Sequence, residues 1–301
     1  MNFLSLKVLL FLSLCLALPS RCLAQDDDVV RTNTDLVILN ITVTDSAGKY
    51  VRGLQKADFK VYEDGKEVDA SLITGFALQE SPFASVVLLD TSGSMESRLS
   101  LGRSAAIRFL DGLREEDVAA VFRFDTKVEQ LQDFSGGRDL APIAYSIRAK
   151  GMTTLNDAIV RATEALNKRQ ERRKAIVILS DGIDTFSNAS SRRALESALA
   201  IGASIYAVDM SPTDRARGFQ TALMLRDFAD KTGGRFVASP GGPALRDAFA
   251  NIAEELGHQY TLAYRPLNPA RDGKWRKLEV KLSDSGLTVR TRKGYRAAPK
   301  E

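Results

Sequence analysis

A change of hydrophobic period along the chain restricts the fold more than any other feature. Residues 35–76 and 260–291 contain short runs that are rich in β-branched residues or alternate apolar with polar side chains, as in half-buried strands. Between them, Phe83–Leu89 and Ala175–Leu179 are almost wholly apolar, as in parallel strands that are buried on both faces. The order predicts an α/β domain placed between two sets of β strands.

The central block alternates strands with helices. Strands are expected at 83–89, 118–124, 175–179, 204–208 and 235–237, and helices at 97–113, 155–167, 192–200, 219–231 and 243–256. This alternation predicts a doubly wound, mostly parallel sheet with helices on both faces.

The flanking blocks supply too few strands to fold separately. Strands are expected at 36–44, 59–63 and 68–76 before the central block, and at 260–264, 277–282 and 287–291 after it. Because neither set alone buries a core, we expect the two sets to pair into one small β-sandwich around an inserted α/β domain. The predicted boundaries are 31–80 and 258–298 for the sandwich and 82–257 for the α/β domain.

Residues 1–24 have the pattern of a secretory signal peptide. Lys7 precedes the apolar run Val8–Leu18, and Cys22-Leu23-Ala24 ends in a small residue suited to cleavage. The run spans roughly 11 residues, about half of what a membrane-spanning helix needs. We therefore expect an exported protein, periplasmic or secreted, with no membrane span.

Composition excludes several kinds of site. Cys15 and Cys22 both lie in the predicted signal peptide, so the exported chain has no thiol for catalysis, zinc binding or an iron–sulfur cluster. His258 is the sole histidine and no G-x-S-x-G motif is present, which argues against a histidine metal site and a Ser-His-Asp triad. The formal net charge is +4 at pH 7 without a basic stripe, so no nucleic-acid partner is expected.

Oxygen-bearing side chains follow the predicted strands at the edge where open α/β sheets bind ligands. One group follows the strand that ends at Leu89, a second precedes the helix 155–167, and a third follows the strand that ends at Leu179. In chain order these residues are Asp90, Ser92, Ser94, Thr153, Thr154 and Asp181. Carboxylate and hydroxyl oxygens suit a hard divalent cation such as Mg²⁺.

These three loops resemble the metal-ion-dependent adhesion site of von Willebrand factor type A domains. The resemblance rests on Asp-x-Ser-x-Ser after a buried strand, a Thr before a helix and a later Ser-Asp-Gly. It implies that a metal ion, Mg²⁺ with Mn²⁺ or Ca²⁺ as alternatives, is held by Asp90, Ser92, Ser94, Thr153 and Asp181. The family commonly has Gly-Gly-Thr where this chain has Gly151-Met152-Thr153, so Thr154 stays open as an alternative ligand. The spacing Thr-x-Leu-x-Asp-Ala, which starts at Thr153, favours Thr153.

The flanks are similar to those of the secreted bacterial VWFA-related family. The similarity lies in Val51–Leu54, Asp58-Phe59 and Glu63–Gly65 before the central block and in Arg292–Tyr295 after it. It therefore extends the resemblance to both sets of flanking strands.

The resemblance implies a non-enzymatic binding or adhesion module, with no catalytic and no cofactor-binding residues. Its partner would be a protein that completes the metal's coordination with an Asp or Glu carboxylate. Loops at 125–126, 187–191 and 209–213 are expected to form the rim of the binding face. The oligomeric state stays open.

Two alternative functions remain. One is a Mg²⁺-dependent hydrolase, in which Asp181 or Asp184 is the base. The other is a structural metal, with partner binding by the β domain. Because Ser, Thr and Asp at strand–helix junctions also cap helices, Asp184 is expected to be a cap for the segment that follows it.

Overall fold

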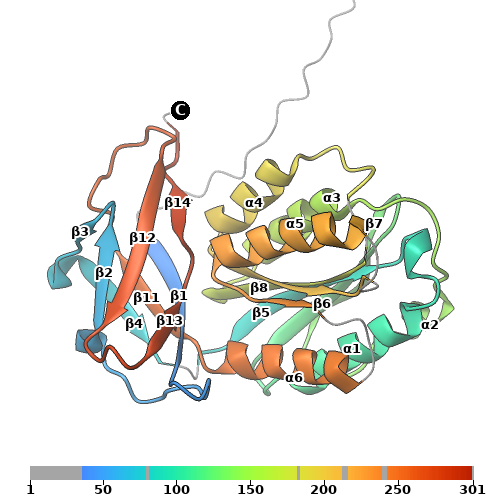
Figure 1. The fold of residues 1–301 in the computed structure, drawn as a ribbon, viewed down its shortest axis with the longest axis horizontal. Helices are drawn as coiled ribbons and strands as arrows, with labels where there is room; N and C mark the ends of the chain where they lie inside the picture. Colours follow the sequence, from blue (N-terminus) through green and yellow to red (C-terminus); the bar gives the residue numbers. More distant parts are fainter. Residues whose placement is uncertain (1–35, 79–80, 182–183, 212–215, 239–242, 300–301) are drawn as a thin grey trace, which may run out of the picture.

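The computed structural model describes residues 36–78, 81–181, 184–211, 216–238 and 243–299. Figure 1 shows two units side by side, a β-sandwich and a larger α/β unit. The predicted signal peptide, residues 1–24, lies outside the described residues.

The α/β unit is built on a six-stranded sheet. Its strands, in spatial order, are β10 (Phe236–Ala238), β9 (Ala203–Asp209), β8 (Arg173–Ser180), β5 (Phe83–Asp90), β6 (Val118–Phe124) and β7 (Val128–Ser135). Neighbouring strands are parallel except for β7, which pairs antiparallel with β6. The edge strand β7 was not expected from the sequence, and the other five strands were.

Helices cover both faces of this sheet (Figure 1). One face carries α1 (Leu99–Asp111), α2 (Ile143–Ser146) and α6 (Pro243–Gly257), and the other carries α3 (Leu155–Asn167), α4 (Ser191–Ala200) and α5 (Ala216–Thr232). Side chains alternate along each strand, so Val87 and Leu89 of β5 join one core while Val86 and Leu88 join the other. Every residue of β5 is buried, which explains its apolar sequence.

The β-sandwich combines strands from both flanks. One sheet has the order β13 (Thr288–Arg290), β1 (Val37–Thr44), β11 (Tyr260–Tyr264) and β4 (Ile73–Ala77), and the other has the order β14 (Gly294–Arg296), β12 (Trp275–Leu282), β2 (Phe59–Glu63) and β3 (Lys66–Glu67). In Figure 1 the blue N-terminal strands therefore lie among the orange and red C-terminal ones. Together with the six-stranded sheet, this arrangement confirms the predicted fold class.

The predicted strand at 68–76 is wrong in its first part. A short 3₁₀ helix, Ala70–Leu72, precedes β4. The Asp69 side chain accepts a hydrogen bond from the backbone N–H of Ser71 at 2.8 Å. This local contact favours a turn of the backbone at these residues instead of an extended strand. Two further 3₁₀ helices occur at Lys56–Asp58 and Gly93–Met95.

Buried polar contacts join the two units. The Asn40 side chain of β1 donates to the carbonyl of Gly202 at 3.2 Å, and Arg292 donates to the carbonyl of Leu199 at 3.0 Å. The carboxylate of Glu255, in α6, accepts from the hydroxyl of Tyr206 in β9 and forms an ion pair with Arg290 in β13. The units therefore share a polar interface in addition to their separate cores.

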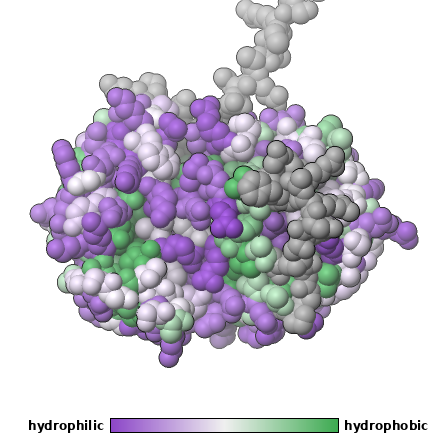
Figure 2. Space-filling view, viewed as in Figure 1, coloured by the Kyte–Doolittle hydropathy of each residue, from purple (hydrophilic) through white to green (hydrophobic). Residues whose placement is uncertain are grey.

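Figure 2 shows hydrophilic residues over most of the visible face, with apolar residues in separate patches. Over the described ranges, no helix combines the length and the apolar character that crossing a bilayer requires.

Candidate metal centre

The centre lies where the strand order of the sheet reverses. The chain leaves β5 toward β6 on one side, and it runs from β8 toward β9 and β10 on the other. Asp90 is the last residue of β5, Ser180 is the last residue of β8, and Asp181 follows it directly. Open α/β sheets bind ligands at such a point, outside the carboxyl ends of the strands.

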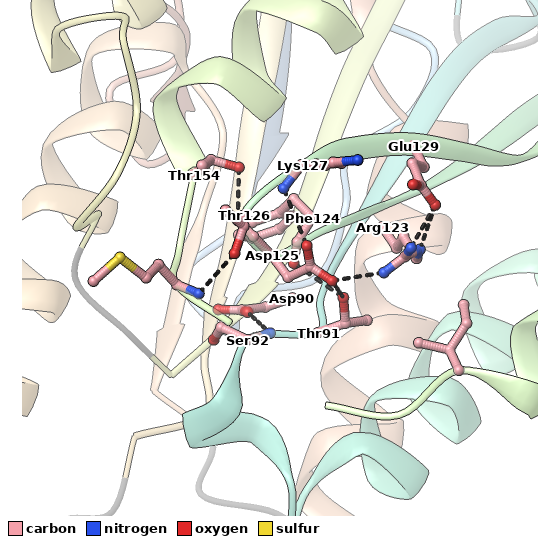
Figure 3. A network of polar contacts seen from close by, with 12 residues as sticks. Asp90, Thr91, Ser92, Arg123, Phe124, Asp125, Thr126, Lys127, Glu129 and Thr154 are labelled. Carbon is pink, nitrogen blue, oxygen red and sulfur yellow. Dashed lines mark hydrogen bonds and ion pairs between the residues drawn. The ribbon is translucent and has the colours of Figure 1, made fainter. Parts of the chain in front are cut away.

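Asp90 is a fully buried carboxylate. Its Oδ1 accepts from the backbone N–H of Ser92 at 2.8 Å (Figure 3). Its Oδ2 accepts from the Ser180 hydroxyl at 2.6 Å. Burial raises the pKa of Asp90 to about 6, against the lowering effect of these hydrogen bonds, and the nearby charge of Asp181 raises it further. Asp90 thus has neutral donors and a like charge around it, so a cation would stabilise its ionised form.

Ser92, Ser94 and Asp181 form a chain of hydrogen bonds. The two serine hydroxyl oxygens lie 3.2 Å apart, and the Ser94 hydroxyl donates to Oδ1 of Asp181 at 2.6 Å. Arg98 donates to the other oxygen, Oδ2, at 2.9 Å. Ser94 is exposed while the Asp181 side chain is 3% exposed. These hydrogen-bonded oxygens therefore extend from the buried end of β5 to the solvent.

The second loop holds two buried threonines with different surroundings. The Thr154 hydroxyl donates to the carbonyl of Asp125 at 2.9 Å (Figure 3). The backbone N–H of Thr153 donates to the Thr185 hydroxyl at 3.1 Å. Within the part of the chain that the structure describes, the Thr153 hydroxyl takes no part in the hydrogen bonds that join Asp90, Ser92, Ser94 and Asp181.

Backbone hydrogen bonds tie the three loops together. Gly93 N–H donates to the carbonyl of Gly151 at 3.1 Å, and Thr185 N–H donates to the carbonyl of Thr153 at 2.9 Å. Gly151 has a φ of +76°, and a Cβ at this position would overlap the Thr126 hydroxyl. A glycine is therefore required where the second loop meets its neighbours.

Asp184 acts as the cap that the sequence predicts. Its Oδ1 accepts from the backbone N–H of Ser187 at 3.1 Å, in the segment that follows. Its Oδ2 accepts from the backbone N–H of Asn156 at 2.7 Å, in the first turn of α3. The second contact, which the sequence does not indicate, ties the third loop to the helix that follows the second loop.

The predicted rim needs correction at its two aspartates. Asp125 is 5% exposed, and its carboxylate accepts from Arg123 at 2.6 Å and from the backbone N–H of Lys127 at 3.0 Å (Figure 3). Asp209 is 7% exposed and accepts from the backbone N–H of Ser211 at 2.8 Å. Both carboxylates are buried and hold turns. Residues 212 and 213 lie outside the described ranges, whereas Thr126, Asn188 and Ser190 are exposed.

Sequence reasoning missed Ser180 and Arg98. Ser180 directly precedes Asp181 in the Ser-Asp-Gly motif, so that motif was a usable signal for it. Arg98 contacts a residue 83 positions away, and no local spacing reveals such a contact.

The donor set fits a divalent cation. The described residues contain no group of three or more His, Cys, Asp or Glu side chains that could hold a metal ion. The candidate centre instead combines the carboxylates of Asp90 and Asp181 with hydroxyl groups. Among the described residues, the groups that donate to its most buried carboxylate are neutral. Hard oxygen ligands of this kind suit Mg²⁺, which keeps several waters of its own.

Comparison with protein families identifies this architecture. Residues 85–183 match the family model of the von Willebrand factor type A domain, over the segment that carries all three loops. This chain therefore carries a von Willebrand factor type A domain within its α/β unit. Such domains are typically protein-interaction modules, and they commonly bind a divalent metal at the adhesion site.

Curated relatives share the type A segment over part of their length. The inter-alpha-trypsin inhibitor heavy chain H3 of Rattus norvegicus is 30% identical over 109 residues, which are 32% of this chain and 12% of that protein. The Bos taurus protein of the same name is 26% identical over 154 residues, 43% of this chain and 17% of that protein. This chain thus spans less than a fifth of the length of these relatives.

Solved structures with a similar fold have low identity to this chain. A von Willebrand factor type A protein from Catenulispora acidiphila is 12% identical, with 90% of this chain and 76% of that chain covered and a TM-score of 0.48. The PilB minor pilin from Streptococcus sanguinis is 18% identical, with 62% of each chain covered and a TM-score of 0.46.

Proposed function

We propose that this chain is an exported, non-enzymatic binding module that recognises an acidic residue of a protein partner through a divalent metal ion. The main support for this proposal is the environment of the Asp90 carboxylate. Asp90 is a fully buried carboxylate with neutral donors and a second carboxylate nearby, at the ligand-binding edge of a type A domain. A cation at this edge would relieve both the burial of Asp90 and its repulsion from Asp181.

The same five residues that the sequence indicates would hold the ion. The carboxylates are those of Asp90 and Asp181, and the hydroxyls are those of Ser92, Ser94 and Thr153. Thr153 is preferred to Thr154, because the Thr154 hydroxyl already donates to the carbonyl of Asp125. Mg²⁺ is the expected ion, with Mn²⁺ or Ca²⁺ as alternatives. The bound ion would supply a positive charge that a partner's Asp or Glu carboxylate completes.

Exposure at the centre supports binding over hydrolysis. Ser94 and Gly93 are exposed, and the neighbouring side chains Met152 and Phe186 are about half exposed. Metal-assisted hydrolysis needs a positioned base in a site that excludes water. Both oxygens of Asp184 accept hydrogen bonds from its capping contacts, and both oxygens of Asp181 accept from Ser94 and Arg98. Neither carboxylate is therefore poised as a base.

Export and the domain division belong to the same proposal. The signal-like pattern of residues 1–24 supports a periplasmic or secreted location. The proposed division places the type A domain at 82–257 and the two parts of the β-sandwich at 31–80 and 258–298. In this arrangement the β-sandwich supports the type A domain, and the metal edge faces the partner.

A capture experiment tests the proposal. The chain without residues 1–24 is immobilised and exposed to exported proteins of its source cells, in Mg²⁺ or in EDTA. Ser92→Ala removes a proposed ligand, and Ser104→Ala is the matched control, because Ser104 is an exposed serine of α1 that bonds to its own helix. A partner retained in Mg²⁺ by the wild type and by Ser104→Ala, but lost in EDTA and with Ser92→Ala, supports the proposal. A partner retained equally in every arm contradicts it and places binding on another surface.

A further inference from the structure

Arg98 contacts the candidate centre directly. It lies four residues beyond Ser94, and its Nη1 donates to Oδ2 of Asp181 at 2.9 Å. The Arg98 side chain is 18% exposed and that of Asp181 is 3% exposed. The Arg98 backbone is fixed as well, because its N–H donates to the carbonyl of Met95 at 2.8 Å and its carbonyl accepts from Gly102 at 2.9 Å. The guanidinium is therefore held at the start of α1.

The charges around the two carboxylates are unequal. The hydrogen bonds to Asp90 come from a backbone N–H and a hydroxyl, which are neutral. Asp181 accepts from the Ser94 hydroxyl and from the Arg98 guanidinium. Among the described residues, Arg98 is the cation that hydrogen-bonds to either carboxylate. An arginine stays protonated at every physiological pH, so the cluster carries two negative charges and one fixed positive charge.

We propose, building on the metal site proposed above, that Arg98 is an internal counter-cation that weakens metal binding and couples it to the partner's carboxylate. The guanidinium and the metal ion both need Asp181, and two cations at a partly buried site repel each other strongly. Ion binding also requires the Ser94 hydroxyl to turn its hydrogen away from Asp181 and its lone pairs toward the ion.

Charge neutrality then defines the partner group. The two carboxylates, the guanidinium and a divalent ion together carry one net positive charge. One carboxylate from a partner neutralises this charge, so metal and carboxylate strengthen each other's binding, and the coupling is reciprocal. Without the guanidinium, the ion and the two carboxylates are already neutral. The ion would then bind more tightly and gain less from an added carboxylate.

Mn²⁺ binding to the folded chain tests this inference. Isothermal titration with Mn²⁺, with and without acetate as the carboxylate probe, compares the wild type with Arg98→Gln, Arg98→Met and Arg98→Lys. Arg108→Gln is the control for charge, because Arg108 is a half-exposed arginine of α1 that pairs with Asp111. Arg98→Gln and Arg98→Met should bind Mn²⁺ about tenfold more tightly or better, since a nearby positive charge is removed. Arg98→Lys and Arg108→Gln should stay near the wild type, and acetate should strengthen Mn²⁺ binding in the wild type more than in Arg98→Gln.

The outcomes separate this inference from the proposed function. If the wild type binds Mn²⁺ and a folded neutral variant, Gln or Met, binds it no more tightly, Arg98 is not a competing cation and the inference fails alone. If neither the wild type nor the neutral variants bind Mn²⁺, the metal site fails and the inference fails with it. Circular dichroism establishes that each variant is folded.

Discussion

Neighbouring side chains of the same type have different surroundings at the candidate metal centre. Thr153 and Thr154 are both buried, yet only the Thr154 hydroxyl donates to the carbonyl of Asp125 among the contacts that the described residues make. Thr154 therefore supports the loop, whereas no side-chain hydrogen bond to another described residue holds the Thr153 hydroxyl, which we propose turns toward an ion. Sequence spacing favoured Thr153, and the contact made by Thr154 adds a physical reason for that choice.

Substitution of each threonine by alanine should have opposite effects on stability and on Mg²⁺ binding. Thr154→Ala removes a buried hydrogen bond, so its free energy of unfolding should fall by about 1–3 kcal/mol while Mg²⁺ binding persists. Thr153→Ala should lose Mg²⁺ binding and change the free energy of unfolding in EDTA by less than about 1 kcal/mol. Urea unfolding in EDTA and Mg²⁺ titration measure the two effects. Loss of Mg²⁺ binding in Thr154→Ala, with retention in Thr153→Ala, would make Thr154 the ligand.

The buried carboxylate of Asp90 should make stability depend on pH. Burial raises the pKa of Asp90 from 3.8 to about 6 in the folded chain. A raised pKa means that the folded state binds the proton more tightly than the unfolded state does. The contribution of this proton to the free energy of unfolding is therefore full below pH 4 and is lost as the pH rises through 6. In EDTA the loss should be about 3 kcal/mol, at about 1.4 kcal/mol for each pKa unit. Asp90→Asn should lack this pH-dependent component, and equal pH profiles for the two chains would contradict the account.

At the scale of elements, buried apolar strands were the most predictable. The runs that form β5 and β8 are apolar because both faces of these strands are covered by helices. The edge strand β7 was not predicted, because it has no fully buried residue and its sequence shows little alternation. The four-residue helix α2 is too short to show a period. Its formation depends on packing of Ala144 against the core that lies between the sheet and helices α1 and α6.

The start of α3 depends on a cap from another loop. Asp184 accepts from the backbone N–H of Asn156, and no side-chain cap comes from the residue before the helix. Asp184→Ala should therefore lower the free energy of unfolding by about 1–2 kcal/mol. Asp111→Ala is the control, because Asp111 forms an exposed pair with Arg108 and should change stability by less than about 1 kcal/mol. Thermal melting compares the stability of both variants. Equal stability of the two variants would show that the capping contacts of Asp184 do not stabilise the fold.

At the scale of the whole molecule, a buried carboxylate joins the two units. Glu255 is fully buried, lies 2.9 Å from Arg235, accepts from Tyr206 at 2.7 Å and pairs with Arg290. The pairing of the flanking strands was predictable, because neither set could bury a core alone. The polar contacts of Glu255 between the two units were not predictable. Glu255 also hydrogen-bonds with Thr42, which lies 213 positions away in the sequence, and no local pattern reveals such a contact. The ligand set proposed for the metal centre rests on the family resemblance, since composition and spacing indicated only a hard cation.

Removal of Glu255 should destabilise the whole chain. Glu255→Ala leaves two arginines without their buried partner, and the free energy of unfolding should fall by about 3–5 kcal/mol. Asp227→Ala is the control, since the pair of Lys231 with Asp227 is half exposed and should contribute less than about 1 kcal/mol. Urea unfolding measures both variants. A loss of less than about 1 kcal/mol for Glu255→Ala would show that this junction contributes little to stability.

Titration of Mg²⁺ into the folded chain shows whether the candidate centre binds a metal ion. Isothermal titration calorimetry compares the wild type with Ser92→Ala and with the control Ser104→Ala. One Mg²⁺ ion should bind per chain in the wild type and in Ser104→Ala, and none should bind in Ser92→Ala. Equal Mg²⁺ binding in all three chains, or no binding in the wild type, would contradict a metal centre at Asp90, Ser92, Ser94, Thr153 and Asp181.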